Sequence, residues 1–388
     1  MIIEGLSYND KRPVEIFTDK GIIQQIVKKD RLNKTSSSPL YIAPGLIDNQ
    51  VNGYNSVSFG FGSTDKLTVK GVRSVTEAMY RNGVTTFLPT LTTNSHDGLL
   101  ADFSTLAQAV AEDPLLAQSI AGYHLEGPYI SNLDGYRGAH PEKYIRPPDW
   151  QEFMAYNTAA DGKILQVSLA PELDGAMEFI RNCRNNGIRV ALAHHNAGTD
   201  TIKQAVDEGA VIATHLGNGC ANLIDRHHNP LWAQLADDRI YASLICDGFH
   251  LLPEEIQVFY KAKGADRIVL TSDITHFAGM EPGVYTMDDQ KSVELTDDGV
   301  VRYPADNVLA GATFPVTRGV GYIMQVTGCS LEDAVNMACM NPARIYNLTD
   351  RGQLEAGKRA DLIVFTVNDF TVQVQQTFVA GELVYSAG

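Results

Sequence analysis

Residues 188–215 read IRVALAHHNAGTDTIKQAVDEGAVIATH, and this stretch contains the pattern that decides the fold. Ile188–Ala193 and Val211–Thr214 are short apolar runs of strand length, whereas Thr201–Glu208 has the length and periodicity of a helix. A strand, a helix and a second strand in this order are typical of a parallel sheet. Both apolar runs are followed directly by histidine, so the chain sets imidazoles at the ends of predicted strands.

The same alternation extends in both directions along the chain. Eight strands are predicted, at Tyr41–Ile47, Val84–Leu88, Ser119–Leu125, Ile164–Leu169, Ile188–Ala193, Val211–Thr214, Ile240–Ile245 and Arg267–Leu270. The helices predicted between them include Leu67–Arg81, Ala176–Asn186, Thr201–Glu208 and Glu254–Lys263, and two more follow the eighth strand, near Val316–Val326 and from Ser330. This series favours an α/β fold of the (β/α)8 TIM-barrel type. A doubly wound open sheet is the alternative, but no Gly-x-Gly-x-x-Gly follows the first strand.

The two ends of the chain have a different pattern of predicted secondary structure, because their short strands have no helices between them. The predicted strands are Val14–Phe17 and Gly21–Val27 near the start, and Asp361–Phe365, Val372–Val379 and Leu383–Tyr385 near the end. We therefore expect residues 1–43 and 350–388 to form one small β-sandwich, and residues 44–349 to form the barrel.

Composition excludes several classes of protein. The 388 residues include 46 acidic and 31 basic side chains, for a net charge of −15, and 44% are apolar. That apolar share is ordinary for a folded protein and argues against disorder. The acidic balance argues against broad binding of nucleic acid or of anionic membranes, although a local basic pocket for an anionic substrate stays compatible with it.

Neither a membrane nor an oxidising compartment is indicated. No stretch approaches the ~18 consecutive apolar residues of a membrane span. Near the start, Glu4 and Asn9 interrupt the segment where a signal peptide needs an unbroken apolar region. The five cysteines contain no C-x-x-C pair and are odd in number, so we expect a reduced, cytoplasmic protein.

Polar side chains follow six of the eight predicted strands, where a barrel has its active site. The segments are Asp48–Gly53, His124–Pro128, His194–Asn196, Thr214–Leu216, Asp247–His250 and Ser272-Asp273. This ring suits metal-assisted hydrolysis, because catalytic zinc commonly takes three nitrogen or oxygen ligands and leaves one position for water. Glu126, His194 and His215 supply such a set from three strands, and Asp273 is placed to act as general base and then general acid.

The chain resembles the amidohydrolase superfamily, and within it the N-acetylglucosamine-6-phosphate deacetylases. The motifs that carry the resemblance run in the family's order over most of the chain: Ala43-Pro-Gly-Leu-Ile-Asp48, His124-Leu-Glu-Gly-Pro128, Ala170-Pro-Glu172, Thr214-His-Leu216, Asp247-Gly-Phe-His250, Asp273 and Leu309-Ala-Gly311. The family's small β-sandwich, built from both chain ends, matches the terminal segments.

The resemblance implies a role for each matching residue. It implies that Glu126, His194 and His215 bind the metal and that Asp273 is the catalytic acid and base, while His140 polarises the acetyl carbonyl. Gln50 and Asn52 stand where other amidohydrolases have His-x-His, which implies a weak or absent second metal site, and we expect these two amides to contact the substrate. The matches to residues that contact the sugar and its phosphate are Asn218, Gly219, Arg226 and His250. Arg226 is expected to reach a neighbouring subunit, so the resemblance also implies a homodimer.

Three segments depart from the family pattern, and all lie where the substrate is held. They are Gly217–Cys220, Arg226–Pro230 and Ile274–Phe277, the last replacing a smaller and less polar stretch. For Arg226, a solvated loop with Asp225 as the partner is the alternative to phosphate binding. The roles of four other histidines stay open: His195, His227, His228 and His276.

These observations predict a metal-dependent enzyme that hydrolyses the acetamide of an N-acetyl amino sugar 6-phosphate. We expect one divalent ion per chain, with zinc first and iron or another metal as alternatives. Two other functions stay open. One is hydrolysis of an unphosphorylated N-acetylhexosamine or another N-acyl compound, and the other is sugar binding by a relative that has lost catalysis.

Overall fold

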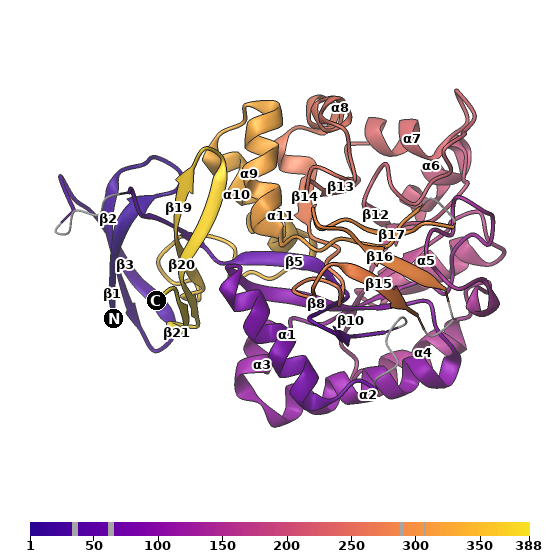
Figure 1. The fold of residues 1–388 in the computed structure, drawn as a ribbon, viewed down its shortest axis with the longest axis horizontal. Coiled ribbons are helices and arrows are strands. Elements are labelled where there is room, and N and C mark those ends of the chain that lie inside the picture. Colours follow the sequence, from indigo (N-terminus) through magenta and orange to yellow (C-terminus); the bar gives the residue numbers. More distant parts are fainter. Residues whose placement is uncertain (33–37, 61–65, 288–290, 306–307) are drawn as a thin grey trace.

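Eight parallel strands form a barrel, as the sequence predicts, and helices surround it (Figure 1). The computed structural model describes residues 1–32, 38–60, 66–287, 291–305 and 308–388. In spatial order the strands are β5 (Leu46–Val51), β8 (Val84–Thr92), β9 (Tyr123–Glu126), β10 (Ile164–Leu169), β11 (Arg189–Leu192), β12 (Ala210–Ala213), β13 (Tyr241–Ile245) and β14 (Ile268–Thr271). The ring closes beyond the last strand, where Val51 and Ile274 form a parallel bridge and the Asn52 N–H donates to the Ile274 carbonyl at 2.7 Å.

The helices pack their apolar faces on the outside of the barrel. The helices of the barrel series are α1 (Val69–Arg81), α2 (His96–Glu112), α3 (Pro114–Ser119), α4 (Trp150–Ala159), α5 (Ala176–Asn185), α6 (Thr199–Glu208), α7 (Pro230–Ala236) and α8 (Pro253–Lys263). In α1, Val72, Val75 and Met79 recur at helical spacing and are buried, and the Thr68 side chain caps the helix by accepting from the Gly71 N–H. Three further helices follow β14: α9 (Val316–Thr327), α10 (Leu331–Met337) and α11 (Met340–Ile345).

The two chain ends build a separate seven-stranded sheet, in which both termini lie (Figure 1). Its order is β21 (Glu382–Ser386), β20 (Thr371–Val379), β19 (Leu362–Asn368), β4 (Tyr41–Pro44), β1 (Ile2–Ser7), β2 (Pro13–Asp19) and β3 (Ile22–Lys28). The strands form one continuous sheet that curls, since the β3 residue Ile23 exchanges backbone hydrogen bonds with the segment before β19. A buried apolar cluster from both chain ends, including Ile16 and Phe378, fills the inside. We propose residues 1–43 with 350–388, and 44–349, as the two domains.

The run predicted as the first barrel strand, Tyr41–Ile47, divides between the two sheets. Tyr41–Pro44 is β4, which pairs with β1 and β19, whereas Leu46 begins β5, which pairs with β8. Gly45 makes the change of sheet possible, because a Cβ there would lie 2.1 Å from Thr85 Oγ1. One apolar run therefore contributes a strand to each of two sheets. Apolar periodicity does not show where one strand ends and the other begins.

Sequence patterns missed a four-stranded antiparallel sheet between β14 and α9. It consists of β15 (Gly283–Thr286), β16 (Ser292–Leu295), β17 (Val301–Tyr303) and β18 (Val308–Leu309). An Asp-Gly pair at positions 298–299 between two alternating runs is a hairpin signal that could have found it. Phe277, Met287 and Tyr303 belong to its buried core, so this sheet has its own apolar cluster beside the barrel.

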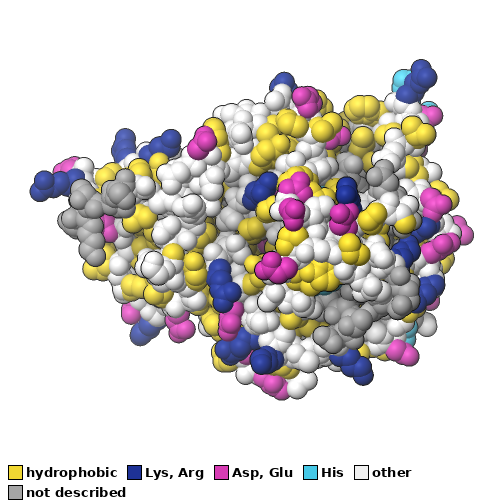
Figure 2. All heavy atoms as spheres, in the orientation of Figure 1, with side chains coloured by type: hydrophobic (Ala, Val, Ile, Leu, Met, Phe, Trp, Pro, Cys, Tyr) yellow, Lys and Arg dark blue, Asp and Glu magenta, His cyan; other side chains and the backbone are white. Residues whose placement is uncertain are grey.

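Charged side chains of both signs are mixed on one face of the molecule. On the face shown in Figure 2, Lys and Arg side chains lie interspersed with Asp and Glu side chains. This pattern is unlike the clustered Lys and Arg of a nucleic-acid-binding surface. In the part of the chain that the structure describes, no helix is long and apolar enough to cross a membrane.

The terminal sheet docks on the barrel through α9, and Gly321 decides how closely. A Cβ at Gly321 would lie 1.9 Å from the Phe370 carbonyl oxygen, in the turn between β19 and β20, whereas a Cβ at Gly319 would meet Cys246 Cβ at an ordinary 3.7 Å. We therefore expect Gly321→Ala to lower the free energy of unfolding by about 2 kcal/mol or more. Gly319→Ala on the same helix should be neutral or stabilise by up to about 1 kcal/mol. Denaturant unfolding of the two variants checks this, and equal stabilities would contradict it.

Candidate active site

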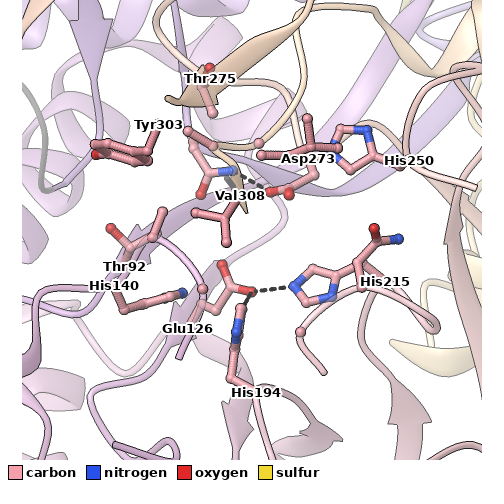
Figure 3. Close-up of a pocket in the computed structure, with 18 of the residues that line it drawn as sticks. Thr92, Glu126, His140, His194, His215, His250, Asp273, Thr275, Tyr303 and Val308 are labelled. Carbon is pink, nitrogen blue, oxygen red and sulfur yellow. Dashed lines mark hydrogen bonds and ion pairs between the residues drawn. The ribbon is translucent and has the colours of Figure 1, made fainter. Parts of the chain in front are cut away.

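The candidate active site lies at the carboxyl ends of the barrel strands. Glu126 is the last residue of β9, while His194, His215 and Asp273 lie two residues beyond the ends of β11, β12 and β14. All four side chains are buried, and they point toward one another (Figure 3). The structure thus brings together the four residues that the sequence proposed for metal binding and acid–base chemistry.

Three of these residues adopt a left-handed backbone conformation. The φ angles are 49° for His194, 30° for His215 and 51° for Asp273, in a region that costs a side-chain-bearing residue about 1–3 kcal/mol. Neighbouring loops hold the conformations, because each of the three carbonyls accepts a backbone hydrogen bond of 2.8–3.0 Å. Such outliers cluster at functional sites, and here they aim three side chains into one space.

Glu126 lies between two imidazoles. Its Oε1 is 3.0 Å from His215 Nε2 and 3.6 Å from His194 Nε2. Burial by itself would raise the pKa of Glu126, but the imidazoles of His194 and His215 outweigh this and hold the pKa well below its usual range. Glu126 is therefore ionised, and the same contact raises the pKa of His215 despite its burial.

The hydrogen bond on the far side of His194 shows that this cluster fits a divalent cation. His194 Nδ1 is 2.8 Å from the Tyr136 carbonyl oxygen, which can only accept, so Nδ1 donates and Nε2 is the ring atom that a neutral imidazole would offer as a ligand beside Glu126. Two electron-pair donors that face each other at 3.6 Å leave room for a cation between them, and both a metal ion and the proton of an imidazolium satisfy this. A histidine fixed by a backbone carbonyl on its other nitrogen is the usual arrangement of a metal-binding imidazole.

His140 approaches the same cluster from the loop after β9. Its Nδ1 lies 2.8 Å from Thr93 Oγ1, and its ring centroid lies 4.5 Å from that of His194. One potential ligand atom each from Glu126, His140 and His194 lie within 4.8 Å of one another. Burial and the neighbouring His194 lower the pKa of His140 to about 3, so its imidazole is neutral at pH 7.

Asp273 is held by two amides at the floor of the site. Its Oδ1 accepts from Asn52 Nδ2 at 2.6 Å and from Gln50 Nε2 at 3.0 Å, and the second proton of that Gln50 amide reaches Glu126 Oε1 at 3.0 Å. Burial and the negative charge of Glu126 raise the pKa of Asp273 to about 7. A carboxyl group with a pKa near neutrality can both take up and release a proton during one reaction cycle.

A pocket of about 380 Å³ opens above these groups. Its wall includes Asn218, Gly219 and His250 from the loops after β12 and β13, and the His250 Nδ1 is held by Asp247 Oδ2 at 2.8 Å. The four-stranded sheet contributes an opposite, largely apolar wall, of which Tyr303 and Val308 are labelled in Figure 3. The sequence did not point to this second wall, because its strands were not predicted.

Two residues predicted to bind substrate lie outside this lining. Gln50 is buried beneath the pocket, where it bridges Asp273 and Glu126. Arg226 lies on an exposed loop whose neighbouring His227 and His228 N–H groups donate to Asp225. Asn52, in contrast, lines the pocket.

Two of the histidines whose roles the sequence left open are buried near the site. His195 has its Nε2 3.2 Å from Gln234 Nε2, behind the ligand cluster. His276 lines the pocket itself, so the structure adds it to the candidate substrate contacts.

Comparisons with known proteins agree with this geometry. A family model described as the Amidohydrolase family matches residues 41–384. The N-acetylglucosamine-6-phosphate deacetylase of Bos taurus is 35% identical over 359 residues, which cover 89% of this chain and 83% of that relative. The deacetylase of the same name from Bacillus subtilis (strain 168) is 30% identical over 83% of this chain and 80% of its own length.

Solved structures give the same result. The N-acetylglucosamine-6-phosphate deacetylase from Thermotoga maritima has a TM-score of 0.86 at 29% identity and covers all of both chains. A point mutant of the Mycobacterium smegmatis enzyme, in complex with N-acetyl-D-glucosamine-6-phosphate, has a TM-score of 0.85 at 28% identity, over 97% of this chain and 95% of that one.

The chain belongs to the amidohydrolase family and is a hydrolytic enzyme. Within that family it is similar to the N-acetylglucosamine-6-phosphate deacetylases over nearly its whole length. The resemblance inferred from the sequence motifs and the expected barrel are thereby confirmed.

We expect the metal content of the protein to depend on the Glu126 carboxylate. Glu126→Gln replaces the charged partner of His194 and His215 with a neutral amide, so the ion should be lost or bound at least about tenfold more weakly. Elemental analysis after dialysis against a weak chelator measures this. Glu172→Gln is the matched control, because Glu172 follows β10 but accepts from the Asn196 N–H. Equal metal content in the two variants would place the ligands elsewhere.

The pH profile should report the ionisation of Asp273. A general base must be deprotonated, so kcat/KM falls as pH drops through its pKa. A bound cation lowers that pKa, which places the acid limb below about pH 7. Asn52→Ala removes a hydrogen bond that favours the charged carboxylate, so it should move the acid limb to higher pH. Asn185→Ala, on the exposed end of α5, should leave the limb in place. An unshifted limb in Asn52→Ala would contradict this assignment.

Proposed function

We propose that this enzyme hydrolyses the acetamide of N-acetylglucosamine 6-phosphate to acetate and the amino sugar phosphate. The observation that carries the proposal is the meeting, in one pocket, of an ionised Glu126 between two imidazoles and of Asp273 with a raised pKa. Relatives that share 30–35% of its residues over most of the chain have this activity in their names, and one similar structure contains this sugar phosphate.

In this proposal Glu126, His194 and His215 hold one divalent ion, zinc in the first place and iron or another metal otherwise. Such an ion polarises the carbonyl group and lowers the pKa of a water molecule toward ~7. The second metal position of related folds is not expected to fill, since Gln50 and Asn52 offer amides where imidazoles would be stronger ligands.

The protein's own groups then move the protons. Asp273 takes a proton from the attacking water while the water oxygen forms a bond to the amide carbon. Asp273 later gives this proton to the amide nitrogen as the C–N bond breaks. His140 is neutral, and its Nε2 is the nitrogen left free by the contact with Thr93. In the tautomer that carries its proton on Nε2, His140 donates a hydrogen bond to the developing oxyanion. Acetate and the free amine are the products.

The phosphate is assigned to the side of the pocket formed by Asn218, Gly219 and His250. Of the described residues that line the pocket, none is Lys or Arg. We propose that Arg226 of a second copy supplies the missing cation, as bidentate phosphate binding by arginine would require. Leu223 on the Arg226 loop and Trp232 on α7 are also exposed, at 91% and 50%, which fits an interface between copies. We therefore propose a homodimer. The free cysteines of the chain suit a reducing compartment, and we propose the cytoplasm.

The absence of Lys and Arg from the described pocket lining is also the one observation that favours a second candidate. If no neighbouring arginine completes the pocket, the same machinery would hydrolyse an unphosphorylated N-acetylhexosamine or another N-acyl compound.

Acetate release from metal-analysed protein decides between the two candidates. We expect kcat/KM for N-acetylglucosamine 6-phosphate to exceed that for N-acetylglucosamine by about 100-fold or more, the value of charge-assisted hydrogen bonds to one phosphate. Arg226→Ala should remove most of this preference. The control Arg181→Ala, at an exposed position of α5, should leave the preference unchanged. Asp273→Asn should abolish turnover of either sugar.

Comparable rates with both sugars would support the deacetylation reaction but reject recognition of the phosphate group. An absence of acetate from both would reject the proposed function.

A further inference from the structure

The loop after β14 presents an imidazole to the pocket that the mechanism does not use. His276 lines the pocket, and only 9% of its surface is exposed. Neither of its ring nitrogens has a hydrogen-bond partner among the residues that the structure describes. Other histidines of the site each have one: His140 with Thr93, His194 with Tyr136, His215 with Glu126 and His250 with Asp247.

The surrounding loop holds His276 in place. Its carbonyl accepts from the Ser56 N–H at 2.8 Å, and the preceding Thr275 bonds to the Ala312 carbonyl through both its N–H, at 2.9 Å, and its hydroxyl, at 3.2 Å. The Phe277 ring lies 4.1 Å from the imidazole, centroid to centroid. The backbone that carries the imidazole is therefore fixed before a ligand enters, and the ring packs on Phe277, as suits a recognition group.

Several apolar side chains line the pocket together with His276. Phe277, Met287 and Val308 line this side of the pocket. Burial lowers the pKa of His276 to about 4, so the ring is neutral at pH 7 and offers one donor and one acceptor. The ring nitrogens of His276 are not among the fully buried polar atoms that lack a partner, so they open on the pocket. A ligand hydroxyl, which is also one donor and an acceptor, can hydrogen-bond to them there.

His276 and His250 flank Asp273 on opposite sides. In the closed barrel β14 lies between β13, whose following loop carries His250, and β5. The His276 loop packs on the segment after β5, since Asn55 and Ser56 donate to Ala278 and His276. A ligand with its amide at Asp273 and its phosphate toward His250 therefore turns its far edge toward His276. In a hexosamine 6-phosphate, that edge carries the hydroxyls next to the amide-bearing carbon.

We propose that His276 is a specificity-determining residue that binds a ring hydroxyl beside the amide-bearing carbon, at C1 or C3 of the sugar. The assignment rests on the proposed function, because that function sets the orientation of the sugar. It also gives a use to the segment Ile274–Phe277, one of the three segments in which the sequence departs from the family pattern.

The test compares three substrates by acetate release: N-acetylglucosamine 6-phosphate and its 1-deoxy and 3-deoxy analogues. We expect His276→Leu to lower kcat/KM for the full substrate about tenfold or more, mainly through KM, with metal content unchanged. The native enzyme should show a similar loss with the analogue that lacks the bound hydroxyl. The His276→Leu enzyme should then have similar kcat/KM values for that analogue and for the full substrate. The analogue on which the native enzyme loses activity shows whether the bound hydroxyl is at C1 or C3.

Two further variants keep the result interpretable. His276→Asn retains a donor and an acceptor and should recover part of the discrimination, which a loss of packing alone would not restore. His96→Leu removes a histidine at the start of α2, outside the pocket lining, and should leave kcat/KM near the native value.

A native kcat/KM in His276→Leu, or an equal loss with both analogues in native and variant enzyme, would overturn the proposal while leaving the deacetylase function in place. If the native protein released no acetate from any of the three sugars, both proposals would fall.

Discussion

The buried Glu126 carboxylate is the constraint on which the rest of the site depends. A carboxylate in this position is unfavourable unless opposite charge surrounds it, and the imidazoles of His194 and His215 are the groups in reach. These partners come from other strands, so the charge is compensated only when β9, β11 and β12 end at one rim. The barrel therefore creates the site by fixing the ends of strands that are distant in sequence.

A polar framework inside the barrel holds these strand ends. His124, two residues before Glu126, bridges Thr90 on β8 and Ser168 on β10 at 3.2 and 2.7 Å, and the Ser168 hydroxyl continues to Thr214 at 3.0 Å. These buried groups satisfy one another across four strands, which favours a single arrangement of the rim. The same rigidity holds His194, His215 and Asp273 in left-handed conformations that isolated residues avoid.

Glu126 and Asp273 show how one pocket gives two carboxyl groups different tasks. Both are buried and both hydrogen-bond to the Gln50 amide, yet the pKa of Glu126 is lowered and that of Asp273 is raised. The difference arises because the two imidazoles face Glu126, whereas Asp273 is buried beside the negative charge that Glu126 retains. One group is thereby suited to hold a cation and the other to exchange a proton near neutral pH.

The sequence by itself determined the barrel and the identity of the residues at its rim, because strand–helix alternation and the residues that end each strand are local properties. It did not separate Tyr41–Pro44 from β5 or reveal the sheet β15–β18, since both depend on which partners a short apolar run finds. Only the tertiary structure decided that Gln50 lies beneath the pocket and that His276 faces into it with no hydrogen-bond partner among the described residues. Those roles follow from distances between segments far apart in the chain, and no local pattern records such distances.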